Sequence, residues 1–393
     1  MVRVGITGIG GYGRVLLDLL LGAQRDGRGS LDAAVVSMVE QDAEHLAHLR
    51  ALSPTTRIFK TLEEAVDSGI ELDVMVLPVG IGAHKDLTLS ALDAGWNVLV
   101  EKPLAGSVSD AEAMIQAAES SERFVAVGYQ DVYDPGVLAV KQALVDGEIG
   151  DVKSVRTSGL WGRPVDYYQR NAWAGRIRYK GRSVYDSPFN NGLAHALNMA
   201  FFLTGSKLNA SAIPVSVSGK MWRAHSIESC DTAYLQWTTE RGHELSILFS
   251  HTGIEQLGPK LILEGEKGTV YWKFNSHLEL CPNDGEPVRY DFPELSDLRR
   301  QMVLRVLRRI NDPQQAVYTP RQAAAQVLAV ELAHRQIEIQ DFDPVRVQKI
   351  STIGEDGDTH DWLEVAGLQE INDAFFANGH CASVQSSLED MTK

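Results

Sequence analysis

A glycine-rich turn between an apolar strand and a helix is the feature that most constrains the fold of this chain. The segment VRVGIT has the character of a buried strand and runs directly into GIGGYG, which contains Gly8, Gly10 and Gly13. An apolar helical stretch, RVLLDLLL, follows at once. In this context the three glycines permit a tight turn, close approach of backbone to a pyrophosphate, and close packing of helix on strand. The pattern predicts the start of a dinucleotide-binding Rossmann domain, with a glycine turn that binds no ligand as the alternative.

The first 130 residues alternate short apolar runs with amphipathic stretches, which is typical of a parallel sheet covered by helices. We expect strands at 3–7, 34–39, 73–77, 97–100 and 124–127. Helical spacing of apolar residues predicts helices at 15–21, 63–67, 83–94 and 109–120. Ser109 and Glu112 form a capping box that would start the last of these helices.

After about residue 150 the pattern changes to period-two alternation, which indicates an open, largely antiparallel sheet. Strands are expected at 152–158, 233–238, 245–249, 261–264 and 269–272, and helices at 191–203, 320–340 and 363–376. The predicted fold class is therefore an α/β Rossmann domain, residues 1–128, followed by an α+β domain, residues 129–393, with a C-terminal tail at 351–393.

The charge balance limits the partners of the chain. Its 37 basic and 52 acidic residues give a formal net charge of -15, a field that repels phosphate backbones and anionic lipid, so neither nucleic acid nor a membrane is expected as partner. No export signal and no run of about 18 apolar residues is present. The one concentrated basic stretch is interpreted as a solvated or subunit-facing amphipathic helix rather than an anion site; it contains Arg299, Arg300, Arg305, Arg308 and Arg309.

The cysteines and one carboxylate add two further expectations. Three scattered cysteines without a CxxC pair argue against a disulfide framework and a structural zinc site, which favours a cytoplasmic location and no metal.

Glu40, at the end of the second expected strand, is placed to bind the adenosine ribose of NAD. Its carboxylate would repel a 2'-phosphate, so NAD is favoured and NADP remains the alternative.

Later segments carry a resemblance to a known family. LPVGIGAHKDLTLSALDAGWNVLVEKPLAGS, with Glu101, Lys102 and Pro103, is similar to the fourth and fifth strand region of the glucose-fructose oxidoreductase and inositol dehydrogenase (Gfo/Idh/MocA) family. VGYQDVYDPGVLAVKQALVDGEIGDVKSV, DTAYLQW and LILEGEKGTVYW resemble that family's domain junction and second-domain strands. The resemblance implies hydride transfer between NAD(P) and a hydroxyl carbon of a cyclic polyol, sugar or sugar-derived substrate. It also implies a homodimer or homotetramer formed through the second-domain sheet, and a Lys-Pro peptide that is often cis.

The resemblance points to catalytic residues, and one of them departs from the family pattern. Removing a hydroxyl proton needs a base beside the oxygen, and the family uses a lysine, an aspartate and a histidine. Lys102 and His195 match that pattern, but the position one turn before His195 is Asn191, and Asn198 stands where a second carboxylate is common. An amide takes up no proton. We therefore expect His195 to transfer the proton, Lys102 to polarise the oxygen, Asn191 to bind a neighbouring hydroxyl and Asp186 to supply the missing charge.

Two sets of binding residues complete the prediction. Those expected at the cofactor are Gly8, Gly10, Gly11, Tyr12, Gly13, Glu40, Pro78, His84, Glu101 and Lys102. Aromatic faces cover the C–H surfaces of a ring while Arg and Asn bind its hydroxyls, which makes the aromatic segment 161–191 a candidate pocket or lid, with interdomain packing as the alternative. Those expected at the substrate are Tyr129, Trp161, Arg163, Tyr168, Trp173, Asp186, Asn190 and Asn191.

Two other functions remain open at the level of sequence. Some relatives keep NAD bound and oxidise only transiently, so a redox-neutral lyase or epimerase is one alternative. A non-catalytic regulatory protein that retained the dinucleotide site is the other, because both Asn191 and Asn198 are amides.

Overall fold

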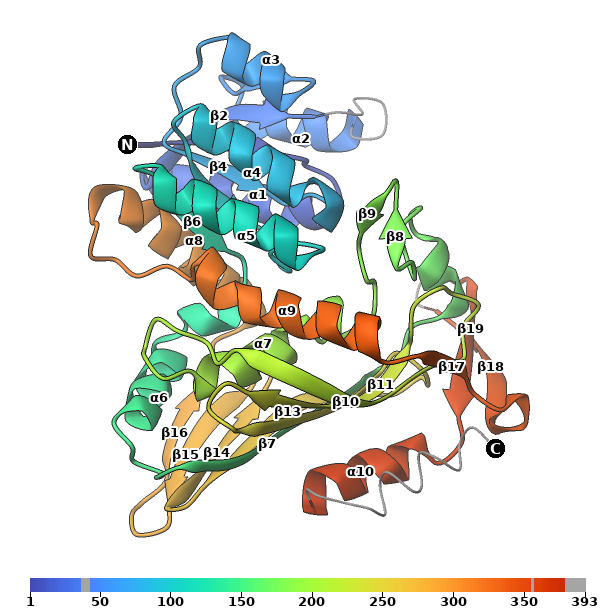
Figure 1. Cartoon of the computed structure of the whole chain (residues 1–393). Helices are drawn as coiled ribbons and strands as arrows, with labels where there is room; N and C mark the ends of the chain where they lie inside the picture. The colour runs from blue at the N-terminus through green and yellow to red at the C-terminus, as the bar shows by residue number, and fades with distance from the viewer. Residues whose placement is uncertain (37–42, 355–356, 379–393) are drawn as a thin grey trace. The chain divides into compact units, whose positions relative to one another are not determined.

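The computed structural model describes residues 1–36, 43–354 and 357–378, and it divides into two compact units (Figure 1). The first unit combines Met1–Asp134 with Pro293–Ala324, and the second combines Pro135–Phe292 with Ala325–Lys393. The sequence analysis assigned residues 293–324 to the second domain. They group with the first unit because helix α8 (Leu295–Asn311) packs against α1 (Tyr12–Arg25) and η2 (Gln130–Tyr133).

The first unit is built on a six-stranded parallel sheet in the order β3-β2-β1-β4-β5-β6. This is the strand order of a Rossmann fold, as predicted. Its central strands are buried throughout because helices cover the sheet, which explains their almost uninterrupted apolar sequence. The strands are β1 (Val2–Thr7), β2 (Gly29–Val35), β3 (Arg57–Phe59), β4 (Val74–Leu77), β5 (Asn97–Val100) and β6 (Val125–Val127).

The helices of this unit follow from apolar stripes and caps. Helix α1 buries Leu16, Leu17, Leu20 and Leu21 at helical spacing. Ser107, and not Ser109, caps α5, because Ser107 is extended and its hydroxyl accepts from the Asp110 N–H while Ser109 lies inside the helix. Besides α1 and α8, the unit contains α2 (Ala43–Leu52), α3 (Leu62–Asp67), η1 (Ile81–Ala83), α4 (His84–Asp93) and α5 (Val108–Ser120).

The second unit contains a nine-stranded sheet in the order β16-β15-β14-β13-β7-β12-β11-β10-β17. Only the β7–β12 and β10–β17 pairs are parallel, so the predicted open and mostly antiparallel sheet is confirmed. The strands are β7 (Val152–Trp161), β10 (Pro214–Arg223), β11 (Thr232–Thr239), β12 (Glu244–Ser250), β13 (Gln256–Gly265), β14 (Gly268–Lys273), β15 (His277–Pro282), β16 (Val288–Asp291) and β17 (Ile339–Asp341).

Helix α7 (Ala194–Thr204) packs on β7 and β13 and is buried along its whole length. It is preceded by short elements that form the aromatic segment. The unit's remaining helices and short strands are α6 (Pro135–Val145), η3 (Val165–Gln169), β8 (Arg178–Tyr179), β9 (Arg182–Ser183), η4 (Pro188–Asn190) and η5 (Pro344–Arg346). Helix α9 (Pro320–Gln336) is shorter than predicted, because residues 339–341 pair with β10 as β17.

The C-terminal part differs from the predicted helix at 363–376. Residues Thr359–Val365 form β19, which pairs antiparallel with β18 (Val347–Ile353), and α10 (Leu368–Asn378) begins only afterwards. Gly367, with φ +83°, separates the two elements. Phe375 of α10 is completely buried in a cluster with Trp222 and Tyr234, so this tail is part of the core.

Candidate functional site

The glycine turn after β1 has a backbone that side chains would obstruct. Gly8 and Gly11 have φ values of +88° and +53°, in the region that favours glycine. A Cβ on Gly13 would lie only 2.4 Å from the Gly8 carbonyl oxygen and 3.3 Å from the ring of Pro78, which follows β4. The Gly13 N–H donates to the Gly10 carbonyl at 2.9 Å, and α1 begins here. The start of the helix therefore presents N–H groups beside a compact turn, an arrangement that suits a pyrophosphate.

The Glu-Lys-Pro segment follows β5 at the same edge of the sheet. Glu101 is buried, and its Oε2 accepts from the Lys102 N–H at 3.2 Å, whereas its Oε1 has no hydrogen-bond partner in the described part of the chain. A Cβ on Gly128 would lie 2.6 Å from that Oε1, so only glycine leaves room for this carboxyl group. Burial raises the pKa of Glu101 to about 7, against the opposing charge of Lys102. The Lys102–Pro103 peptide is cis, as the resemblance implied.

His84 connects two loops of this edge. Its Nδ1 lies 3.0 Å from the Pro103 carbonyl oxygen and its Nε2 lies 3.0 Å from that of Val79. Burial lowers the pKa of His84, so the ring is neutral and donates from one nitrogen only. These contacts let His84 fix the position of the Glu-Lys-Pro loop, and its predicted contact with the cofactor stays a prediction.

Helix α8 contributes to the same region. The Arg299 guanidinium lies 5.2 Å from the ring centre of Tyr12 in the first turn of α1, and Arg300 binds Asp26 at 2.7 Å. Burial raises the pKa of Tyr12, and the nearby charge of Arg299 opposes this. The basic helix that was interpreted as a solvated or subunit-facing flank therefore holds the first unit together.

Tyr129, predicted at the substrate, is buried, and its ring lies edge-on to that of Tyr318, with 5.9 Å between the ring centres.

The first unit therefore fits a dinucleotide. Gly8 follows β1, Pro78 follows β4 and Glu101 follows β5, and these three strands are neighbours in the sheet. The carboxyl ends of parallel strands lie at one edge, and the change of direction between β1 and β4 is where open α/β sheets bind ligands. Glu40, the predicted ribose ligand, lies outside the described residues.

His195 lies in the first turn of α7 in the second unit, 7% exposed, with its ring 5.4 Å from that of Phe274. Asn191 was expected one helical turn before it on the same helix. It instead precedes the helix, with φ -116° and ψ -104°, because η4 occupies residues 188–190 and α7 begins at Ala194. Asn198 is buried on α7. Lys102 and His195 belong to different units, and the predicted approach of their nitrogens stays a prediction.

Asp186 lies against Asn191. The Asn191 Nδ2 donates to Asp186 Oδ1 at 2.7 Å and to the Tyr167 hydroxyl at 3.0 Å. The other carboxylate oxygen of Asp186 accepts from the Gly175 N–H at 2.7 Å, and Arg170 lies 3.4 Å away. A buried carboxylate therefore stands next to the amide that replaces the family's aspartate. Tyr167 belongs to the aromatic segment that was expected to form a pocket or lid, although it was not among the residues predicted at the substrate.

The remaining predicted substrate residues fall into two groups, apart from Tyr168, whose ring lies 5.3 Å from that of Tyr167 and 4.8 Å from that of His225. Trp161 and Trp173 belong to an aromatic cluster in which the Arg163 and Arg170 guanidinium groups lie 5.0 Å and 3.8 Å from the Tyr167 ring centre. Asn190, by contrast, is buried and its amide is used within the fold, because it donates to Val184 and accepts from Gln326. Asn190 thus acts in this structure as a support for the loop.

Neither a metal centre nor a membrane-spanning helix is found in the part of the chain that the structure describes. Within residues 1–36, 43–354 and 357–378, His, Cys, Asp and Glu form no group of three that suits a metal ion. In the same ranges, every helix is too short or too polar to cross a lipid bilayer.

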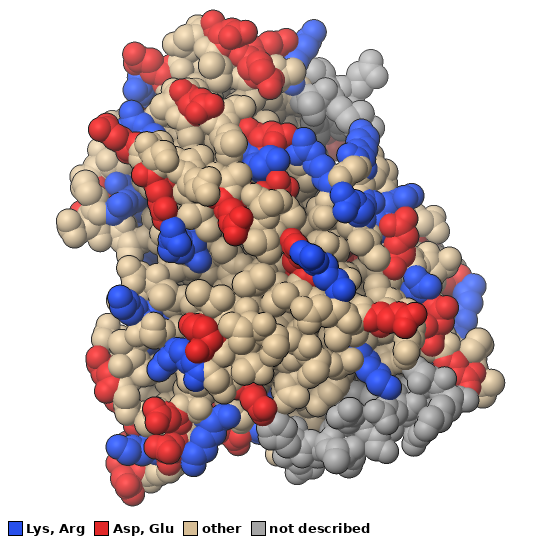
Figure 2. Space-filling model, in the orientation of Figure 1, with Lys and Arg blue, Asp and Glu red and all other residues tan. Residues whose placement is uncertain are grey.

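Acidic and basic side chains are interspersed on the face of the molecule shown in Figure 2.

Comparison with known proteins agrees with this geometry. Residues 2–129 match the model of an oxidoreductase family with an NAD-binding Rossmann fold, and residues 137–271 match the GFO/IDH/MocA C-terminal domain. Inositol 2-dehydrogenase of Rhizobium meliloti is 27% identical over 55% of this chain and 57% of its own length. The scyllo-inositol 2-dehydrogenase (NADP(+)) IolW of Bacillus subtilis is 23% identical over 67% of each chain.

Among solved structures, the WlbA dehydrogenase of Bordetella pertussis in complex with NADH and UDP-GlcNAcA has the same fold. Its TM-score is 0.69 at 23% identity, over 85% of this chain and 95% of that one. The two family models together cover more than half of the chain, and they match its two units in sequence order. The chain therefore belongs to the GFO/IDH/MocA family of oxidoreductases with an NAD-binding Rossmann domain.

Proposed function

We propose that this protein is an NAD-dependent dehydrogenase that transfers a hydride between the cofactor and a hydroxyl carbon of a cyclic polyol, sugar or sugar-derived substrate. One observation carries the proposal. The glycine turn after β1 and Lys102 after β5 lie at the same edge of one parallel sheet, with only β4 between their strands. That edge is where a dinucleotide and its reacting partner meet in open α/β sheets.

The chain's own residues would handle the proton. The bound nicotinamide supplies the hydride chemistry. His195 takes up the hydroxyl proton as the carbinol is oxidised, and the Lys102 ammonium polarises the oxygen. Asn191 uses its amide hydrogens on Asp186 and Tyr167, so the amide oxygen is the atom that accepts from a neighbouring substrate hydroxyl. Asp186, in contact with Asn191, supplies the carboxylate charge that the family's aspartate would bring.

The proposed substrate class is supported by the names of the relatives and by the aromatic and basic side chains of the segment 161–191. The two curated relatives are named for dehydrogenation of inositols, and the solved relative is a complex with NADH and UDP-GlcNAcA. Trp161, Tyr167 and Trp173 provide aromatic faces for the C–H surface of a ring, and Arg163 and Arg170 provide donors. The preference for NAD over NADP rests on Glu40. Cytoplasmic location and assembly through the second-unit sheet stay predictions from the cysteine pattern and the resemblance.

The experiment that tests this function is His195→Ala, assayed for both turnover and NADH binding. We expect turnover of the best substrate in a polyol and sugar panel to fall by about 100-fold or more, because the proton acceptor is lost. The dissociation constant of NADH, measured by fluorescence titration, should change less than about threefold. His243→Ala is the control, since His243 is another buried histidine of the second unit that lies in the turn between β11 and β12.

Equal loss of turnover and NADH affinity in His195→Ala would contradict the assigned role. The panel itself separates the alternatives. Stoichiometric NADH release supports the dehydrogenase, turnover without net NADH identifies a redox-neutral enzyme, and binding without turnover identifies a regulatory protein. The same titration repeated with NADPH tests the cofactor preference, and tighter binding of NADPH contradicts it.

A further inference from the structure

A second candidate site lies in the second unit, and its lining includes Tyr168, predicted at the substrate, but neither Lys102 nor His195. It is a cavity of about 480 Å³ between the loop that follows η3 and the loop that joins β10 to β11. Cavities of this size hold small-molecule ligands. The lining combines aromatic, aliphatic and polar side chains, among them Tyr168, Gln169, Arg176, His225, Ser226 and Ile227.

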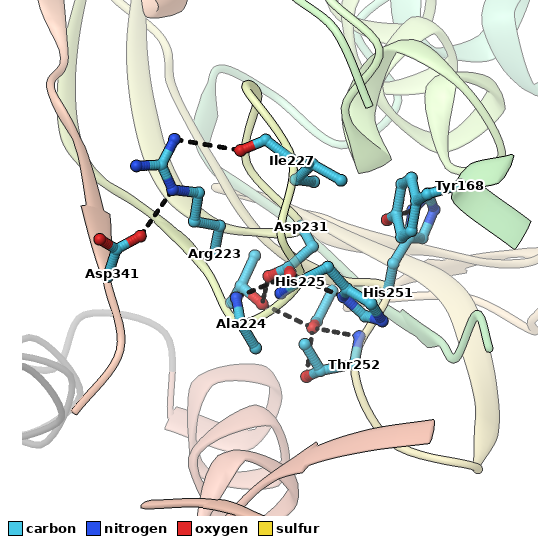
Figure 3. Close-up of polar contacts among 11 residues, drawn as sticks. Tyr168, Arg223, Ala224, His225, Ile227, Asp231, His251, Thr252 and Asp341 are labelled. Carbon is cyan, nitrogen blue, oxygen red and sulfur yellow. Dashed lines mark hydrogen bonds and ion pairs between the residues drawn. The ribbon is translucent and has the colours of Figure 1, made fainter. Parts of the chain in front are cut away.

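The two loops are tied together by backbone contacts, so the cavity has a fixed wall. The N–H groups of Glu228 and Ser229 donate to the Gly175 carbonyl at 3.0 Å and 2.9 Å. Arg223 donates to the Ile227 carbonyl at 3.1 Å and to Asp341 at 2.6 Å (Figure 3). A loop held by side chains from two strands needs little ordering when a ligand binds, which favours affinity.

His225 is the group that gives this cavity its chemistry. Its Nδ1 lies 2.8 Å from Asp231 Oδ2, and the same oxygen accepts the N–H groups of Ala224 and His225 itself (Figure 3). Asp231 is completely buried, and its Oδ1 accepts from the Thr232 hydroxyl at 3.1 Å. Because Asp231 Oδ2 already accepts two backbone N–H groups, we assign the hydrogen of this contact to His225 Nδ1. In the tautomer with its hydrogen on Nδ1, Nε2 is a hydrogen-bond acceptor.

That acceptor has no hydrogen-bond partner among the described residues, although His225 is only 4% exposed. Buried polar atoms without a partner are uncommon and costly, so each calls for an explanation, and at a cavity wall a bound ligand is one such explanation. The Tyr168 ring lies 4.8 Å from the His225 ring, and its hydroxyl contacts His251 Nδ1 at 3.2 Å (Figure 3). The Tyr168 hydroxyl therefore already has a partner within the fold, and His225 Nε2 does not.

The charges around the cavity decide which ligand it suits. Arg176 and Glu228, both lining residues, form an ion pair with each other at 3.3 Å. Because they neutralise each other, the lining favours neither an anion nor a cation. Gln169 and Ser226 add uncharged donors and acceptors, while Tyr168 and Ile227 offer apolar faces. This combination matches a neutral ring that carries several hydroxyl groups.

We propose that this cavity is a second binding site for a small neutral polyol, such as a cyclitol or monosaccharide, with one ligand hydroxyl donating to His225 Nε2. The site does not rest on the proposed dehydrogenase activity, since Lys102 and His195 take no part in it. The cavity adjoins Asn191 through Asp186, because one carboxylate oxygen accepts the Gly175 N–H of the cavity wall and the other accepts from the Asn191 amide.

Titration of the full-length protein without nucleotide, with its histidine side chains labelled with ¹⁵N, tests this site. The probes are myo-inositol and D-glucose as neutral polyols and D-glucuronate as the anionic comparison. We expect a saturable shift of the His225 Nε2 resonance with a neutral probe. The affinity of that probe should fall by about tenfold or more in His225→Gln, because the acceptor is displaced from the cavity. It should stay unchanged in His243→Gln, the matched buried histidine.

A second variant keeps the test valid if His225→Gln fails to fold. Ser226→Val keeps the contact between His225 and Asp231 and replaces a lining hydroxyl by two methyl groups, and it should also weaken binding of the neutral probe. His195→Ala should leave the affinity of the neutral probe for this cavity unchanged. A failure of the proposed catalytic role of His195 can therefore be distinguished from a failure of the second site. No saturable shift with either neutral probe, equal affinity in both lining variants and the parent protein, or binding of D-glucuronate alone would each overturn the proposal.

Discussion

Glu101 is a buried carboxyl group that the surrounding fold leaves only half satisfied. One oxygen accepts a backbone N–H while the other, packed over Gly128, has no partner in the described chain. Burial raises its pKa to about 7, so the folded chain keeps this proton to a higher pH than the unfolded chain does. The protonated group therefore contributes stability in full below pH 4.5, the ordinary value, and this contribution is lost as pH rises towards 7.

Glu101→Gln should remove this pH dependence, because the amide is a neutral isostere of the protonated carboxyl. We expect the variant to match the parent near pH 4.5 and to exceed its free energy of unfolding by roughly 3 kcal/mol at pH 8. Urea unfolding of the nucleotide-free protein across this range measures the difference. Glu122→Gln, at an exposed position, is the control. A constant difference at every pH would show that Glu101 is ionised in the folded chain.

At the scale of elements, α7 is secured at its carboxyl-terminal end by a side chain from α6. Its first turn carries His195, and its last turn receives the buried side chain of Lys141 from α6. The Lys141 Nζ donates to the carbonyls of Phe202 at 2.6 Å, Leu203 at 3.4 Å and Gly205 at 2.5 Å. Burial, with help from Arg241, lowers the pKa of Lys141 to about 7. This amine donates to buried carbonyls at the helix end, of which only that of Phe202 also accepts the Gly205 N–H.

Lys141→Met should destabilise the second unit strongly, because the substitution keeps the side-chain length but removes the amine that donates to the Leu203 and Gly205 carbonyls, leaving Phe202 only the Gly205 N–H. The expected loss in the free energy of unfolding is about 2 to 4 kcal/mol. Lys207→Met, exposed just after the same helix, should stay within about 0.5 kcal/mol of the parent. Chemical denaturation followed by tryptophan fluorescence compares the two variants. Equal stability of Lys141→Met and the parent would mean that the carbonyls find other donors.

The elements themselves show which local patterns were informative. The buried strands at 74–77 and 97–100 were predictable because a short apolar run bounded by turn residues is typical of a strand buried within a parallel sheet. The run at 363–376 was not, because its apolar spacing fits both a strand and a helix and only the positive φ of Gly367 decides between them. The contacts of Lys141 could not be predicted for a different reason, because the carbonyls to which it donates are more than 60 positions away in the sequence.

At the scale of the whole molecule, the candidate site could be predicted only in part. The glycine turn and Lys102 depend on local motifs within one sheet, so their sequence context was sufficient. The contact between Asp186 and Asn191 depends on where η4 ends and α7 begins, which the sequence analysis placed three residues too early. His225 and Asp231 are joined by the β10–β11 loop, and although Asp231 begins the segment DTAYLQW, no local pattern indicated its contact with His225.

The discontinuous first unit leads to a prediction about fragments. Helix α8 buries Leu298, Met302, Val303, Val306 and Leu307, and it packs on α1 and η2 of the same unit. A fragment of residues 1–134 should therefore be markedly less stable than the same fragment joined to residues 293–324 by a flexible linker, because the first fragment exposes the surface that α8 covers. Thermal unfolding followed by circular dichroism compares them. Identical midpoints would show that the strands and helices of residues 1–134 are self-sufficient.

The order of synthesis gives this arrangement a consequence in the cell. A ribosome releases the chain from its first residue onwards, and an amino-terminal domain usually folds as soon as it has emerged. Here the nascent Rossmann sheet must wait for α8 until the intervening 158 residues, 135–292, have been translated. During that interval its uncovered apolar surface is available to chaperones, so we infer that biogenesis of this oxidoreductase depends on them more than its finished stability suggests.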